Sequence, residues 1–273
     1  MAATEPIDIL KLGIGDAEAG LVLSAEAGWN QNVADWRYFL SHGVVYGVRD
    51  RDRLVATAAL LPYSAGNAWI SMVLVTADFR RRGIATRLID ACLGAAVQRN
   101  LTTWLDATPA GATVYGPLGF TPTLELRRLR LLQPNGAEAP QACSGSVDAL
   151  ITRDTGAIGF ERNSLLSEFA ARADSRIVSN RRAVALVRSG RTARHIGPIL
   201  ADGTDEALVL VNAIIHAESG PWLIDAVHSR SEFLDGLVGS GWNIERPFQR
   251  MRFGRQTTSP TQLPFAVAGP EFG

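Results

Sequence analysis

Three consecutive arginines followed by small residues form the segment of this sequence best suited to chemistry. The segment lies between an apolar run ending at Val75 and a helical pattern, and it reads Arg80, Arg81, Arg82, Gly83, Ile84, Ala85, Thr86. The first turn of a helix presents N–H groups without an intrahelical partner and the positive end of the helix dipole. Small residues let the backbone approach an anion closely, and arginines add charge-assisted hydrogen bonds. The sequence therefore predicts a pyrophosphate site at this turn.

The elements that would position this turn alternate between strands and helices over residues 1–132. Apolar residues at helical spacing predict helices over 16–27, 33–40 and 83–98, and a short helix ending at Tyr115. Apolar runs predict strands over 6–12, 44–48, 54–62, 68–75, 102–106 and 120–132. The pyrophosphate turn thus joins a buried strand to an amphipathic helix.

Composition and charge limit the classes of function. The chain has 273 residues, 47% of them hydrophobic and 20% charged, with 27 basic and 27 acidic side chains. At about 150 residues per domain this length predicts two domains, and such a chain can bury a full core without a metal or a disulfide. Zero net charge disfavours binding to nucleic acid or to an acidic membrane surface. Lys11 is the only lysine, which excludes the lysine of a Walker A phosphate loop.

The sequence carries no pattern for export, membrane insertion or metal binding. Its N-terminus lacks a basic segment followed by an apolar run, and no apolar stretch reaches the roughly 18 residues that a spanning helix needs. Cys92 and Cys143 are isolated from each other, and the spacing of His195, His216 and His228 matches no metal site. We expect a cytoplasmic protein that binds no metal.

The pattern changes after residue 132. Residues 133–146 are rich in Pro, Gly, Ala and Ser, which is typical of a linker between domains. Residues 147–256 repeat the mixed pattern, with helices expected over 162–173, 205–217 and 231–238, and strands over 175–178, 183–188, 193–200, 222–227 and a final strand pair over 242–253. Residues 257–273 contain three prolines and few periodic apolar residues, so we expect a poorly ordered tail.

Two motifs in the first half resemble the GNAT superfamily of acetyl-CoA-dependent acyltransferases. Residues 80–85 match the family's Arg/Gln-x-x-Gly-x-Gly/Ala motif, which follows a bulged strand, here ending at 73–75. Residues 115–120 match its second motif, Tyr-x-x-x-Gly-Phe. The two motifs stand in the family's order, with a strand between them. The resemblance implies an α+β fold of three layers, in which each GNAT-like unit has a mixed, mostly antiparallel twisted sheet flanked by helices.

The resemblance also implies roles for these residues. The strand end would pair with the pantetheine arm of acetyl-CoA and the helix start would hold its pyrophosphate; the cofactor-binding residues would be Val73, Leu74, Val75, Arg80, Arg81, Arg82, Gly83, Ile84, Ala85 and Thr86. Tyr115 would protonate the leaving thiolate, since a phenol with a pKa of about 10 stays protonated at neutral pH. The acceptor would be an amine that attacks the thioester.

Two positions depart from the family's pattern. Many relatives place an asparagine seven residues before the tyrosine, where this chain has Thr108. Relatives often carry a glutamate on the strand before the first motif as general base, but residues 69–73 contain no carboxylate. Glu26, Asp106 and Asp225 are candidates for the base. A base acting through water, or an amine that is already neutral, also stays open.

The second half resembles the degenerate second unit of tandem GNAT proteins. The resemblance rests on residues 196–201, which read IGPILA and precede a helix, and on Arg250-Met251. Where the first unit has three arginines, the second has Asp202, Asp205 and Glu206 at the helix start. Carboxylates there cap a helix well but repel a pyrophosphate. We therefore expect acetyl-CoA in the first unit only.

The acceptor site is expected in the cleft between the two units, where ligand sites are common. Trp29 and Asn30 lie in the turn where GNAT enzymes receive the acceptor. Arg162 and Asp225 resemble positions shared within the tandem group and could bind substrate or form an inter-domain salt bridge. We expect an N-acetyltransferase for a small primary amine, reacting in a ternary complex. The alternatives are a non-catalytic acyl-CoA-binding module and a protein N-acetyltransferase, and the sequence specifies no oligomeric state.

Overall fold

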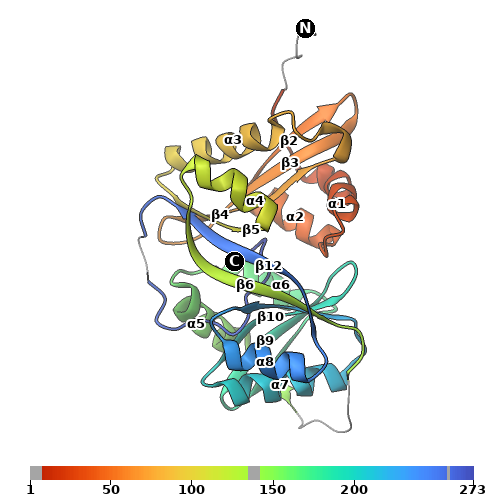
Figure 1. The fold of residues 1–273 in the computed structure, drawn as a ribbon, viewed down its shortest axis with the longest axis vertical. Coiled ribbons are helices and arrows are strands. Elements are labelled where there is room, and N and C mark those ends of the chain that lie inside the picture. The colour runs from red at the N-terminus through yellow and green to blue at the C-terminus, as the bar shows by residue number, and fades with distance from the viewer. Residues whose placement is uncertain (1–7, 135–141, 257–258) are drawn as a thin grey trace.

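The fold is built on one twelve-stranded sheet with helices on both faces. The computed structural model describes residues 8–134, 142–256 and 259–273. The strands lie in the order β1-β2-β3-β4-β5-β12-β6-β11-β10-β9-β8-β7, and Figure 1 shows two halves stacked along the long axis. The β4/β5 and β10/β11 pairs are parallel and the other pairs are antiparallel. This mixed, mostly antiparallel sheet is the α+β fold that the sequence predicted.

The first half contains the alternating elements expected of it. Its strands are β1 (Leu10–Lys11), β2 (Val44–Asp50), β3 (Arg53–Pro62), β4 (Asn67–Val75), β5 (Thr102–Ala107) and β6 (Thr121–Leu131). Its helices are α1 (Ala17–Glu26), α2 (Val33–His42), α3 (Ile84–Gln98) and α4 (Pro109–Tyr115). Local capping explains where the helices begin: the Asn32 side chain accepts from the backbone of Asp35 to start α2, and Thr108 accepts from Gly111 to start α4.

The second half repeats this alternation. Its strands are β7 (Cys143–Ser144), β8 (Arg176–Asn180), β9 (Ala183–Ser189), β10 (Arg194–Ala201), β11 (Trp222–Val227) and β12 (Asn243–Phe253). Its helices are α5 (Val147–Ile158), α6 (Asn163–Ala171), α7 (Thr204–Ala217) and α8 (Ser231–Gly239). Helix α5 was not expected; Ser146 caps it by accepting from two backbone N–H groups. Of the predicted linker, residues 135–141 lie outside the described residues.

The two halves exchange their last strands. Strand β12 pairs with β5 of the first half on one edge and with β6 on the other, while β6 pairs with β11 of the second half. The strand pair expected over 242–253 is therefore one long strand, β12, whose register against β6 shifts twice. The sheet is continuous between the two halves, although the sequence predicted a domain boundary at residue 132. Each half thus includes a strand that the sequence places in the other.

Each half also contains one parallel strand pair that diverges. Strand β4 pairs with β5 over three residues, from Asn67 to Trp69, and then separates from it. Met72, just beyond, has a φ of 51° and marks a bulge in β4. Beyond Trp69, the edge of β4 that faces β5 has no strand partner in the described chain. This leaves backbone groups of β4 free to pair with something other than a strand.

The core continues from one half into the other. Helix α3 packs on one face of β2 to β5, and α1 and α2 pack on the opposite face. The cluster under α1 and α2 also includes buried residues of α5 and α6, with Phe39, Phe169 and Phe272 at its centre. Phe272 stacks on Phe39 with ring centroids 4.8 Å apart. Helices α7 and α8 cover the second half in a separate cluster.

The end of the chain is part of this core, which corrects the expectation of a poorly ordered tail. Residues 264–273 are all buried. Trp69 Nε1 donates to the Pro270 carbonyl at 2.9 Å, and the Tyr63 hydroxyl donates to the Phe272 carbonyl at 2.8 Å. The prolines and missing periodicity marked a segment without regular structure, but its order comes from contacts with distant strands. Residues 257–258 lie outside the described residues.

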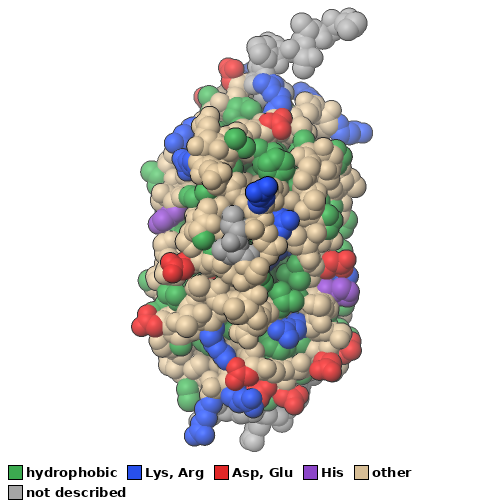
Figure 2. Space-filling view, turned by 90° about the vertical axis from the view of Figure 1, so that its left-hand side faces the viewer, with side chains coloured by type: hydrophobic (Ala, Val, Ile, Leu, Met, Phe, Trp, Pro, Cys, Tyr) green, Lys and Arg blue, Asp and Glu red, His purple; other side chains and the backbone are tan. Residues whose placement is uncertain are grey.

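On the face drawn in Figure 2, acidic and basic side chains of the described chain are interspersed. Within residues 8–134, 142–256 and 259–273, no helix is long and apolar enough to cross a membrane.

Candidate active site

A cavity of about 670 Å³ opens where β4 and β5 diverge. We call the part lined by β4, by the start of α3 and by α4 the outer end of the cavity. The part lined by residues of β12, β6 and the C-terminal tail is called the inner end. The predicted cofactor residues at the outer end that line it are Val73, Leu74, Val75, Arg80, Arg81, Gly83, Ile84, Ala85 and Thr86. The structure thus brings together most of the motif that the sequence singled out.

The start of α3 is built to face an anion. Gly83 precedes the helix with a φ of 73°, a left-handed conformation that glycine adopts without strain. Its missing side chain leaves the first N–H groups of α3 uncapped, and no atom lies within 4 Å of where a Cβ would stand. These N–H groups and the helix dipole lie at the cavity wall.

The three arginines do not act alike. Arg80 and Arg81 line the cavity, and the Arg80 Nε donates to the carbonyl of Val75 at 3.0 Å. Arg82 does not line it: its guanidinium donates to the Asp78 carbonyl at 2.7 Å and lies 4.7 Å from the centroid of the Phe79 ring. Arg82 therefore stabilises the turn, and the positive side chains that line the cavity at this turn are Arg80 and Arg81.

Tyr115 ends α4 and lines the same cavity. Its ring packs near Phe120, with centroids 5.9 Å apart. Burial, with a smaller effect of Cys92, raises the pKa of Tyr115 to about 12. The phenol is therefore protonated at neutral pH and can donate a proton. Thr108, which stands in place of the family's asparagine, lines the cavity too, with its hydroxyl engaged in capping α4.

Two carboxylates line the cavity among the described residues, Asp106 and Glu271. Asp106 is held by both oxygens on Arg250, at 2.8 Å each, and has a fully buried side chain. Burial raises the pKa of Asp106, against the lowering effect of Arg250. Glu271 was not a candidate from the sequence, because it lies in the tail that was expected to be poorly ordered. No local motif marked it.

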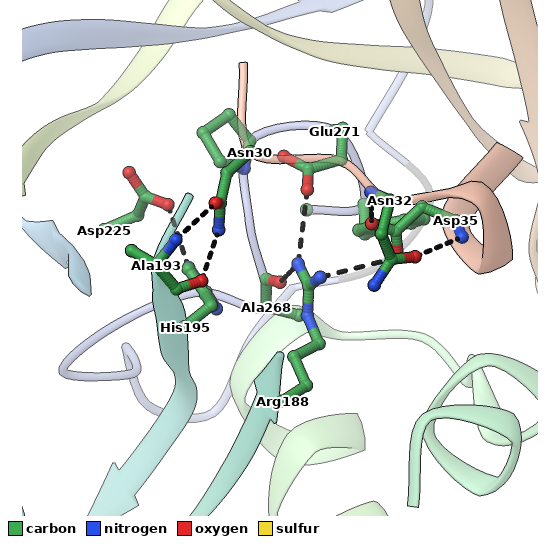
Figure 3. A network of polar contacts seen from close by, with 12 residues as sticks. Asn30, Asn32, Asp35, Arg188, Ala193, His195, Asp225, Ala268 and Glu271 are labelled. Atoms are coloured by element: carbon green, nitrogen blue, oxygen red, sulfur yellow. Dashed lines mark hydrogen bonds and ion pairs between the residues drawn. The ribbon is translucent and has the colours of Figure 1, made fainter. Parts of the chain in front are cut away.

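Glu271 is held more loosely than Asp106. One of its oxygens accepts from Arg188 at 3.2 Å. The same guanidinium also donates to the Ala268 carbonyl at 3.0 Å and reaches Asp35 at 3.5 Å, and Figure 3 shows it between these three groups. Glu271 therefore shares its cation with a second carboxylate, whereas Asp106 has an arginine of its own.

Trp29 lines the inner end of the cavity, but the two other predicted acceptor residues do not. The Asn30 side chain anchors the loop before β10, donating to the Ala193 carbonyl at 3.0 Å and accepting from the backbone of Thr192 and Ala193 (Figure 3). Asp225 is fully buried in β11, where Arg128 and His195 hold it. Both are corrections: short polar side chains in turns and strands satisfy buried backbone and charges more often than they face a ligand.

The other base and salt-bridge candidates also have structural partners. Glu26 accepts from the backbone of Ala77 at 3.2 Å, lies 3.7 Å from Arg53, and does not line the cavity. Arg162 pairs with Asp154, not with Asp225, and donates to the carbonyls of Phe272 and Gly273 at the chain end. In the described chain no group of three or more His, Cys, Asp or Glu side chains is placed to hold a metal ion.

The equivalent groove of the second half is filled by the chain's own tail. Strands β10 and β11 pair over two residues and then diverge, as β4 and β5 do. Ala266 lies in the gap and bridges both strands, opposite Ile199 and Ala226. The adjoining start of α7 carries Asp205 and Glu206. The tail thus occupies the position where the first half has its cavity, and the nearby helix start is acidic.

Comparisons with known proteins agree with this geometry. Residues 21–120 match the model of the acetyltransferase (GNAT) family, and residues 150–266 match the model of a second acetyltransferase (GNAT) domain. The chain belongs to the GNAT superfamily, with two GNAT units in tandem. Its family is one of acetyl-CoA-dependent acetyltransferases.

Several similar proteins align with most of this chain. An uncharacterized N-acetyltransferase of Bacillus subtilis, YitH, is 22% identical over 248 residues, which cover 86% of this chain and 88% of that protein. A putative acetyltransferase from Pyrococcus horikoshii has the same fold, with a TM-score of 0.83 at 18% identity over 100% of this chain and 98% of the other. A tandem GNAT protein from the clavulanic acid biosynthesis pathway gives 0.62 at 14% identity, over 92% and 100%. The tandem arrangement of GNAT units is therefore shared with a solved structure.

Proposed function

We propose that this protein transfers the acetyl group of acetyl-CoA to a primary amine of a small acceptor, by direct attack in a ternary complex. One observation carries the proposal: a single cavity joins the uncapped start of α3, the bulge of β4 and the hydroxyl of Tyr115 to an inner end that holds Glu271. An anion site, a free strand edge, an acid and a carboxylate are the groups that this reaction needs.

The cofactor would enter from the outer end. The backbone N–H groups at the start of α3, with Arg80 and Arg81, would hold the pyrophosphate. The pantetheine arm would pair with the free edge of β4 at Val73 and Val75, like an additional strand. The thioester would then lie near the bulge at Met72, within the part of the cavity that Tyr115 lines.

Starting from an ammonium group, the reaction must remove two protons from the nitrogen and deliver one to the departing thiolate. Glu271, directly or through a water, would accept the proton of the ammonium group, and the neutral amine would attack the thioester carbonyl. The carbon–sulfur bond breaks as the amide forms, and Tyr115 would protonate the departing thiolate. The second proton, which the nitrogen loses as the amide forms, would return to the Tyr115 phenolate through water, and Glu271 would release its own proton to solvent. Holding both reactants in one cavity would supply much of the remaining rate enhancement.

Glu271→Gln tests the function and the proposed base together. The intact chain with acetyl-CoA and a panel of primary amines should release free thiol in equal amount to N-acetylated amine, measured by a thiol reagent and by mass spectrometry. Because glutamine cannot accept the proton, kcat should fall by about 10²–10³-fold. The matched change Glu232→Gln, in the exposed first turn of α8, should leave kcat unchanged.

Three results would contradict separate parts of these proposals. Binding of acetyl-CoA without thiol release from any amine would favour the non-catalytic module over an enzyme. Full activity of Glu271→Gln would leave the acetyltransferase in place but exclude Glu271 as the base. Activity on peptides and proteins alone would favour the protein N-acetyltransferase.

A further inference from the structure

Two arginines face the inner end of the cavity from adjacent strands. Arg128 on β6 and Arg246 on β12 stand directly opposite each other in the strand register, and both line the cavity together with Phe248. Their guanidinium carbons lie 5.2 and 5.6 Å from the centroid of the Phe248 ring. Like charges directly opposite each other on a sheet are destabilising unless something neutralises them.

Arg128 is neutralised by the protein. It donates from Nε and from its terminal nitrogen to the two oxygens of Asp225, at 2.8 Å each. Asp225 also contacts Nε2 of His195 at 3.0 Å. This bidentate pair is buried and neutralises the charge of Arg128, so Arg128 attracts an anion less strongly than an unpaired guanidinium would.

Arg246 has no such partner. No side chain or carbonyl of the described residues accepts a hydrogen bond from its guanidinium, which is half-buried. The nearest carboxylates are engaged elsewhere: Glu245 pairs with Arg130, and Asp225 is held by Arg128 and His195. Burial first, and then Arg128, lower the pKa of Arg246, against the raising effects of Asp225 and Glu245.

The carboxylates that line the cavity come from other elements than Arg246 does. These two carboxylates, Asp106 and Glu271, come from β5 and from the tail, and each is bound to a different arginine, Arg250 or Arg188. The inner end therefore combines carboxylates that are already paired with a guanidinium that has no hydrogen-bonded partner among the described residues. An acceptor amine that also carries an anion would complement this guanidinium.

We propose that the acceptor is an amine that also carries a carboxylate, and that Arg246 binds this carboxylate. The inference rests on the proposed acetyl transfer and adds the substrate class. A single guanidinium fork matches a planar carboxylate with two parallel hydrogen bonds. The carboxylate would supply the counter-ion that Arg246 lacks, while the amine lies toward Glu271 and the thioester. Polyamines and simple alkylamines lack the group that Arg246 requires.

Matched acceptors provide the test. Each of a set of amino acids is compared with its carboxamide, which keeps the amine and side chain and removes the negative charge, at equal concentrations of free amine. An aminoalkyl phosphate and an alkylamine complete the panel. We expect kcat/KM for the best amino acid to exceed that for its carboxamide by roughly 10- to 100-fold, as for a charge-assisted hydrogen-bonded pair.

The variant Arg246→Gln should remove this preference. The ratio of acid to carboxamide should fall to nearly one, mainly through a higher KM for the acid, and Arg246→Lys should restore part of it. The matched change Arg252→Gln, on the same strand with its guanidinium bound to Gln256 outside the cavity, should keep the wild-type ratio. Thermal unfolding of each variant checks that the fold is intact.

The outcomes separate the two proposals. If no amine of any kind yields thiol and product, acetyl transfer itself is wrong and the substrate class falls with it. If amines react but carboxamides are used as well as acids, or the preference survives Arg246→Gln, acetyl transfer stands and the role of Arg246 is wrong. A preference for the aminoalkyl phosphate would keep Arg246 as an anion site but overturn the carboxylate.

Discussion

Tyr115→Phe should lower kcat by about 10²–10⁴-fold and change the Kd for acetyl-CoA by less than about threefold. The substitution removes one hydroxyl and keeps the ring that packs near Phe120. In the proposed reaction that hydroxyl protonates the thiolate, a step that occurs only after binding. The loss should therefore appear in turnover, measured by thiol release at saturating acetyl-CoA, and not in affinity, measured by calorimetry.

The pH profile adds a second readout for Tyr115. An acid works in its protonated form, and burial raises the pKa of this phenol to about 12. Wild-type kcat should therefore show no alkaline loss from Tyr115 below about pH 11. Tyr46→Phe is the matched control, because Tyr46 packs against the same core cluster but does not line the cavity. Equal kcat for Tyr115→Phe and Tyr46→Phe would show that another group supplies the proton.

Gly83→Glu should abolish measurable binding of acetyl-CoA. A carboxylate at this position would stand at the uncapped start of α3, where the pyrophosphate is proposed to lie. Two like unit charges about 4 Å apart repel by roughly 1–4 kcal/mol, depending on their exposure to solvent, which is about a fivefold to thousandfold loss in affinity. The pyrophosphate carries more than one charge, so the upper part of this range is expected in calorimetry.

Two controls separate repulsion from other effects of the change. Gly83→Ala adds the strain of a side chain at a φ of 73° without charge, and nothing lies within 4 Å of the added Cβ, so most of the affinity should remain. Gly94→Glu adds the same charge to the same helix, about 16 Å along its axis, and should bind normally. Unchanged affinity in Gly83→Glu would contradict a pyrophosphate at the start of α3.

The cofactor end of the cavity could be read from the sequence because it is local. A strand, a turn and a helix start that follow one another in the chain also lie together in space, so residues 73–86 needed no tertiary information. Arg82 shows the limit even there. The sequence gives three equivalent arginines, and only the fold turns one of them away from the cavity, toward Phe79 and the Asp78 carbonyl.

The acceptor end is assembled from segments far apart in the chain. Arg246 and Glu271 join Trp29 only because β12 crosses into the first half and because the tail is buried. No periodic pattern in the sequence marks either feature. From the sequence, β12 looks like the end of the second unit, and residues 264–273 resemble a loop. Long-range pairing of this kind decides which polar side chains line the cavity, and so the sequence pointed to Asn30 and Asp225, whereas the cavity is lined by Glu271 and Arg246.

We expect only the first of the two GNAT units to bind acetyl-CoA, because the tail fills the groove of the second beside an acidic helix start. Calorimetric titration of the intact chain with acetyl-CoA tests this most directly. We predict one molecule bound per chain, and none in the variant Gly83→Glu. Two equal sites per chain, or one site that survives Gly83→Glu, would contradict the claim.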